Sequence, residues 1–77
     1  MDLEMNLFSV MYLKGHLIAA MFLWQGATYK DCQTINNQYK KILPSTELIK
    51  SGKAKISDVR MACEWHDKNP VKNGVKL

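Results

Sequence analysis

Residues 17–42 read LIAAMFLWQGATYKDCQTINNQYKKI, and the way this segment folds determines how the rest of the chain can be interpreted. Its first eight residues, 17–24, are all apolar, so a helix made of them would have to be largely buried. Gly26 follows as a natural helix-ending or turn residue. From residue 29 to residue 42 the apolar positions recur at intervals of three and four, which is typical of one apolar stripe on an amphipathic helix. These apolar positions are Cys32, Ile35, Tyr39 and Ile42.

The sequence marks both ends of this amphipathic helix. Thr28 is a suitable N-cap, and Asp31 three positions later resembles the second residue of a capping box. Pro44 ends the helix because it disfavours helical geometry at Leu43. We therefore predict a helix over residues 28–42.

The other segments also indicate short helices. Residues 3–13 place apolar side chains at helical spacing, residues 45–49 can form one helical turn, and residues 57–68 can form a last helix. No run shows sustained alternation of apolar and polar residues, which would indicate a half-buried strand. The sequence thus predicts an all-α fold: one domain over residues 1–69, built as a small bundle of four or five short helices, and a flexible basic tail over 70–77.

Length and charge limit the possible functions. A chain of 77 residues has room for one domain and no separate catalytic module. Eleven Lys and Arg against seven Asp and Glu give a net charge of +4, and the positive excess lies entirely after residue 26. Such a charge can attract nucleic acid or an acidic protein partner, although it can equally be a solvated lysine-rich surface.

A helix-turn-helix unit centred on Gly26 is the leading hypothesis for function. Residues 17–24 would support residues 28–42, which would enter the major groove of DNA. Phe22 and Gln25 oppose this hypothesis, since a small residue and an apolar residue are usual at their positions. The alternative is that the amphipathic helix only packs in a bundle. The side chains predicted to contact bases or phosphates are Tyr29, Lys30, Gln33, Asn37, Lys40, Lys41, Lys53, Lys55 and Arg60.

The N-terminal third is rich in methionine and aromatic residues, and four of the five methionines lie in the first 21 residues. Such a composition is typical of adaptable binding surfaces and dimer interfaces, although these residues can equally form the domain's own core. We expect a homodimer, and the alternative function is a helical protein-protein interaction module or inhibitor. The predicted interface consists of Leu7, Phe8, Met11, Tyr12, Met21, Phe22 and Trp24.

The two cysteines bear on the cellular compartment. Cys32 and Cys63 do not form a metal motif, and we expect two buried thiols, with a disulfide in an exported domain as the alternative. The apolar residues 17–24 are too few for a membrane span. A signal peptide ending at Ala27 would have Gln25 where a small residue is needed. We therefore predict a cytoplasmic protein, with export as the alternative.

Neither catalysis nor a cofactor is predicted. Both cysteines lie on predicted inward stripes, where thiols are generally inert, and no glycine-rich phosphate loop is present. A zinc site of His16, Cys32, Cys63 and His66 would lack the closely spaced ligand pairs of structural zinc sites. The sequence thus predicts a small, non-enzymatic regulatory protein with no catalytic residue and no metal.

Overall fold

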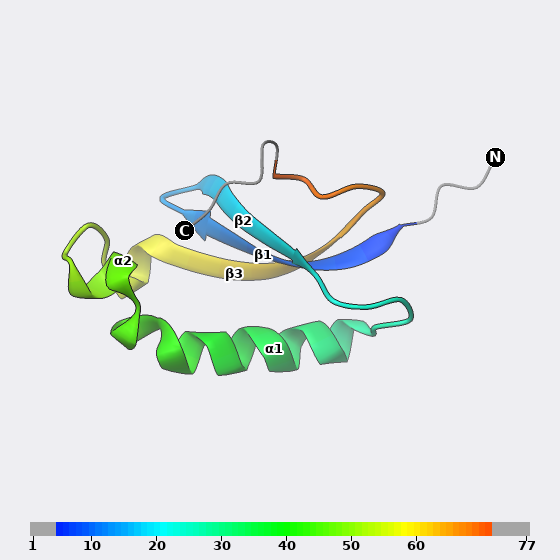
Figure 1. Cartoon of the computed structure of the whole chain (residues 1–77), viewed down its shortest axis with the longest axis horizontal. Helices are drawn as coiled ribbons and strands as arrows, with labels where there is room; N and C mark the ends of the chain where they lie inside the picture. Colours follow the sequence, from blue (N-terminus) through cyan, green and yellow to red (C-terminus); the bar gives the residue numbers. More distant parts are fainter. Residues whose placement is uncertain (1–4, 72–77) are drawn as a thin grey trace.

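The computed structural model describes residues 5–71. It forms a three-stranded antiparallel sheet with one long helix packed against one face (Figure 1). The sheet order is β2-β1-β3, so β1 is central and the other two strands are edges. The predicted all-α bundle is therefore wrong. In chain order the elements are β1 (Asn6–Leu13), β2 (His16–Phe22), α1 (Tyr29–Ile42), η1 (Leu43–Ser45), α2 (Glu47–Lys50), η2 (Ile56–Asp58) and β3 (Val59–His66).

The β1–β2 hairpin stands where helices are predicted over 3–13 and 17–24. Lys14 and Gly15 form its turn with φ values of 50° and 84°. Two consecutive positive φ angles match the twist of a tight hairpin. From Leu7 to Met11 every residue of β1 is buried, so both faces of this central strand are occupied. A strand buried on both faces lacks polar alternation and can be mistaken for a buried helix.

β3 takes the place of the helix predicted over 57–68. Its sequence VRMACEWH does alternate, contrary to the prediction that no run does so. Cys63 faces α1, and the pleat of the strand therefore places Met61 and Trp65 on the same face. The alternate residues lie on the opposite face, and Ala62 among them obscures the polar half of the pattern.

The helix predicted over 28–42 is confirmed, together with its cap. The Asp31 N–H donates to the Thr28 hydroxyl, and the Asp31 carboxylate accepts from the Thr28 N–H. The helix ends at Ile42, where Pro44 lies in the 3-10 turn η1. The helical turn predicted over 45–49 is found as α2. A helix-turn-helix is excluded because the supposed supporting helix belongs to β2 and the connection after it.

The core lies between α1 and the sheet. Leu7, Ala27 and Cys32 form a buried cluster. A disulfide joins Cys32 in α1 to Cys63 in β3, with their Cα atoms 6.1 Å apart. The prediction of two free buried thiols is therefore wrong. Because this bond links the helix to an edge strand, it fixes the position of α1 across the sheet.

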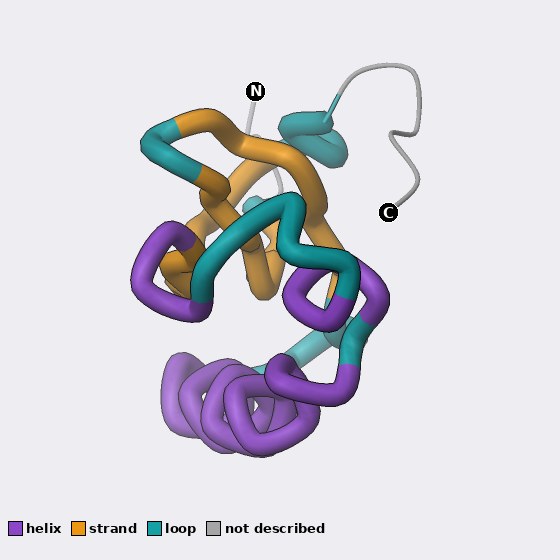
Figure 2. The backbone as a smooth tube through the Cα atoms, turned by 90° about the vertical axis from the view of Figure 1, so that its left-hand side faces the viewer, coloured by secondary structure: helices purple, strands orange, loops and turns teal. Residues whose placement is uncertain are grey.

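No helix of residues 5–71 covers the opposite face of the sheet (Figure 2). Residues 67–71 pass over this side, where the Asn69 side chain donates to the Ala20 carbonyl oxygen at 3.3 Å. Of the predicted tail over 70–77, residues 72–77 lie outside the described part of the chain. Within residues 5–71, no helix combines the length and the apolar character that crossing a membrane requires.

Candidate binding groove

A groove of about 290 Å³ lies between α1 and the edge strand β3. Residues 61–63 of β3 form one bank. The other bank is a stripe of α1 whose side chains are spaced by four, four and three residues, which places them on one helical face. The structure thus brings together four of the residues predicted to contact DNA: Tyr29, Gln33, Asn37 and Lys40.

The other predicted DNA-contacting residues lie outside this groove. Lys30 and Lys41 are exposed on α1, and Lys53 and Lys55 are exposed in the connection after α2. The guanidinium carbon of Arg60 lies 4.3 Å from the centre of the Tyr12 ring, on the other face of the sheet. In Figure 1 the end of α1, the α2 connection and the start of β3 gather at one end of the molecule. Basic side chains are therefore concentrated at that end.

The floor of the groove is polar and buried. Asn36 is only 5% exposed, and its Oδ1 accepts a hydrogen bond from the Ser9 hydroxyl. Its Nδ2 lies 3.3 Å from the Cys63 sulfur. No acidic residue of the described range 5–71 lines this groove. The disulfide and the buried amide of Asn36 therefore hold the floor in place. Lys40 gives the groove its positive charge, and the other side chains that line it are neutral.

Within residues 5–71, the backbone of β3 offers hydrogen-bonding groups beside the groove that no other strand pairs with. The Leu23 N–H donates to the Leu7 carbonyl at 3.3 Å, so Leu7 directs its backbone polar groups toward β2. These directions alternate along an antiparallel strand, so Phe8 and its neighbours two positions apart point toward β3. Their partners in β3 are the even-numbered residues. The outward-pointing backbone groups of β3 therefore belong to Val59, Met61, Cys63 and Trp65.

The predicted dimer interface is divided between core and surface. Leu7, Phe8 and Met11 are buried within the chain itself, and Tyr12 is half-buried. The burial of the first three agrees with the alternative that such residues form the domain's own core. The exposed members are Met21, Phe22 and Trp24, which come from β2 and the residues just after it.

Both tryptophans of the chain line a second hollow, of about 280 Å³, near the far end of β3. Trp24 is 48% exposed and Trp65 is 49% exposed. Met5 joins them, and among residues 5–71 no charged side chain lines this hollow. Met5 and Trp65 are not in the predicted interface. The β1–β2 pairing brings the start of β1 beside the residues that follow β2, and the β1–β3 pairing places Trp65 opposite Leu7.

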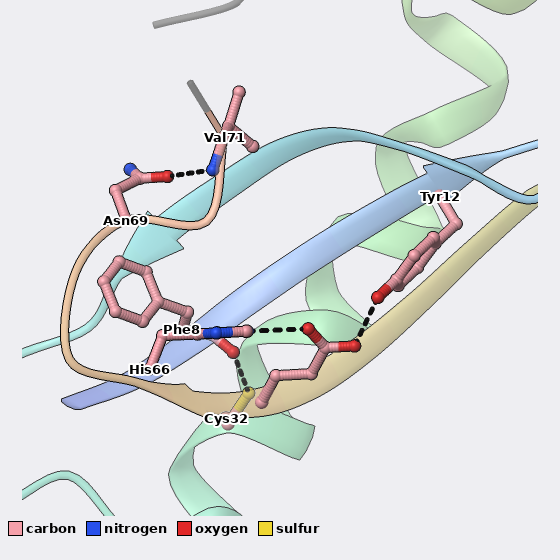
Figure 3. Close-up of polar contacts among 7 residues, drawn as sticks. Phe8, Tyr12, Cys32, His66, Asn69 and Val71 are labelled. Carbon is pink, nitrogen blue, oxygen red and sulfur yellow. Dashed lines mark hydrogen bonds and ion pairs between the residues drawn. The ribbon is translucent and has the colours of Figure 1, made fainter. Parts of the chain in front are cut away.

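A chain of polar contacts lies on the face of the sheet opposite α1 (Figure 3). The Tyr12 hydroxyl donates to Glu64, and the other Glu64 oxygen lies 2.8 Å from Nε2 of His66. Donation to Glu64, with burial and the carboxylate charge, raises the pKa of Tyr12 above its usual value. The same hydrogen bond, with those of His66 and the charges of His66 and Arg60, lowers the pKa of Glu64, although burial opposes this shift.

The described residues contain no group of three His, Cys, Asp or Glu side chains that could hold a metal ion. The zinc set considered from the sequence also has its two sulfurs joined in the disulfide. No protein-family model, curated protein or solved structure matches this chain.

Proposed function

We propose that the protein is a non-catalytic binding module that accepts an extended, acidic polypeptide segment in the groove between α1 and β3. One observation carries this proposal: in the described part of the chain, the edge of β3 is unpaired and faces a polar stripe of α1 across a groove. An extended segment would add a fourth strand, bonding to the backbone of Met61 and Cys63. Its side chains would meet the amides of Gln33 and Asn37, which can both donate and accept hydrogen bonds.

Charge favours an acidic segment. Lys40 lines the groove, and five more basic residues lie in or between the elements at the same end of the molecule: Lys41, Lys50, Lys53, Lys55 and Arg60. Within residues 5–71, no lysine or arginine forms an ion pair with a carboxylate. With a net charge of +4, the chain would speed the encounter with an acidic partner and align it in the groove.

The disulfide favours a particular compartment. Structural disulfides persist in oxidising surroundings and are rare in the cytosol. Because Cys32–Cys63 holds one bank of the groove to the other, we propose that the protein works in an oxidising compartment, as the export alternative requires. Mass spectrometry of the protein from its native source tests this, since the oxidised chain weighs two hydrogens less than the reduced one. A native protein found fully reduced would contradict it.

The proposal is tested by selecting short random peptides from a display library on the oxidised full-length chain. We expect net acidic peptides whose binding shifts the amide NMR signals of Met61 and Cys63. Met61→Pro removes an outward N–H without breaking the ladder to β1, so it should abolish binding. Met61→Ala is the matched control, because it shortens the same side chain and retains the N–H.

Two results would count against strand addition: no enrichment of peptides, or equal binding by Met61→Pro and Met61→Ala. Single-stranded nucleic acid is the second candidate occupant, since Tyr29 can stack on a base and Lys40 can contact a phosphate. If no peptide is enriched, a thymidine oligonucleotide that binds with strong salt dependence and shifts the amide signals of Met61 and Cys63 would favour this second candidate.

A further inference from the structure

The exposure of both tryptophans is unusual for this residue type. Tryptophan is highly buried on average in folded proteins, and it is enriched among the residues that dominate binding energies at interfaces. Here both tryptophans are about half exposed and border the same hollow. They come from segments far apart in the sequence, one before α1 and one near the end of β3. The fold therefore concentrates its strongest anchoring side chains at one place.

The hollow lies in line with the groove. Trp65 follows Cys63 by two residues on the same face of β3, a distance of about 7 Å along the strand. Cys63 lines the groove, whereas Trp65 lines the hollow. A segment paired along β3 would thus pass from Lys40 and Met61 to Trp65, one of the two tryptophans that line the hollow. Because paired strands advance residue for residue, the positions beside Met61 and Trp65 are four residues apart in that segment.

The lining of the hollow selects a different chemistry from that of the groove. The two tryptophans and Met5 provide apolar surface, and Asn6 and Gln25 add amide groups to the lining. A charged side chain would lose its hydration there without gaining an opposite charge. An apolar or aromatic side chain would bury its surface, and the amides could bond to the backbone that carries it.

We infer that this hollow holds an apolar anchor residue of the segment bound in the groove, an inference that rests on the proposed function. The partner therefore carries an apolar or aromatic side chain at one end and acidic side chains beginning four residues away. In the antiparallel orientation the anchor precedes the acidic residues, because the partner then runs from Trp65 toward Val59.

Intrinsic fluorescence gives a direct test, since the only two tryptophans both line the hollow. The probe is the capped peptide Phe-Thr-Val-Thr-Glu-Thr-Glu, and the matched control replaces its Phe with Ala. We expect the Phe peptide to shift the tryptophan emission and to bind at least about tenfold more tightly, a difference of about 1.4 kcal/mol. Binding of both peptides is followed independently through the amide signals of Met61 and Cys63.

Variants of the protein complete the test. Trp24→Ala, in the connection between β2 and α1, should remove the preference for the Phe peptide and leave the Ala peptide unaffected. Ile42→Ala is the control, because Ile42 is similarly exposed, at 52%, but lies outside the hollow. Peptides that move Met61 and Cys63 equally well, without any change in tryptophan emission, would overturn the anchor and leave the proposed function intact. Failure of both peptides to bind would overturn both.

Discussion

The two faces of the sheet are held by different kinds of interaction. On the face covered by α1, a disulfide and a buried hydrogen bond between Ser9 and Asn36 accompany the apolar core. On the opposite face, the rings of Phe8 and Phe22 lie 5.9 Å apart beside the part-buried polar contacts of Glu64. The covered face is held by a disulfide, whose cysteines do not titrate. The contacts on the opposite face depend on the protonation state of Glu64. We therefore expect the face covered by α1 to contribute most of the free energy of unfolding, and the opposite face to make a smaller, pH-dependent contribution.

The difference also bears on binding. The proposed groove borders the covered face, so its two banks are joined by the disulfide and cannot separate without losing the strongest link in the fold. A rigid groove reduces the conformational cost of binding, because the site is organised before the partner arrives.

Removing the disulfide should have the largest effect on the covered face. Cys32→Ala with Cys63→Ala opens a link with a sequence separation of 31. In the chain-entropy account, such a loop contributes about 3–4 kcal/mol to the free energy of unfolding. Urea unfolding of the variant and of the oxidised wild type measures this loss. The reduced wild type is the control, and it should resemble the variant; a loss below about 1 kcal/mol would show that the disulfide is not the main link.

The buried amide on the same face should have the next largest effect. Asn36→Ala leaves the Ser9 hydroxyl buried without its partner and should cost about 1–3 kcal/mol in unfolding free energy. Replacing both residues, with Ser9→Ala and Asn36→Leu, should cost less than Asn36→Ala alone, because no unpaired polar group remains. Asn37→Ala is the control on the exposed side of the helix and should change stability by less than about 0.5 kcal/mol. Equal losses for Asn36→Ala and Asn37→Ala would contradict this account.

The opposite face should respond more weakly. Tyr12→Phe removes one part-buried hydrogen bond, which we expect to contribute about 0.5–1 kcal/mol to the free energy of unfolding. It should also raise the pKa of Glu64, because donation from Tyr12 is the main cause of its lowered value. Urea unfolding measures the first effect, and an NMR titration of the carboxyl carbon measures the second. Tyr39→Phe in α1 is the control, and a Glu64 pKa unchanged by Tyr12→Phe would refute the assignment.

The helix could be predicted from the sequence because its signals are local. Thr28, Asp31 and Pro44 mark its ends, and the apolar stripe between them repeats at helical spacing. The polar stripe that lines the groove lies on the same helix, so helical spacing alone places its side chains on one face and allows them to be predicted from the sequence. The sequence did not predict the bank formed by β3 or the buried Asn36 at the floor of the groove.

The strands could not be predicted in the same way, for physical reasons that differ between them. β1 is buried on both faces, which removes the alternation that marks a strand. The turn residue Lys14 is not among the residues usual at positive φ, so the hairpin signal was weak despite Gly15. β3 does alternate, but Ala62 interrupts its polar half. The meeting of Trp24 with Trp65 depends on strand order, which no local pattern encodes.

The smallest expected effect is the dependence of the second face on pH. The pKa of Glu64 is lowered from its ordinary 4.5 in the folded chain, chiefly by Tyr12. Its contribution is therefore complete above that ordinary value and is lost as the pH falls through the lower folded value. Since the pair is partly exposed, we expect less than about 1 kcal/mol. Tyr12 behaves in the opposite sense: its pKa is raised from 10.0, so its contribution is lost as the pH rises through the folded value.

Urea unfolding over the acid range should show a steeper loss of stability in the wild type than in Glu64→Gln. Glu47→Gln, an exposed carboxylate on α2, should keep the wild-type slope. Identical slopes for wild type and Glu64→Gln would mean that the two faces do not differ in their response to protons.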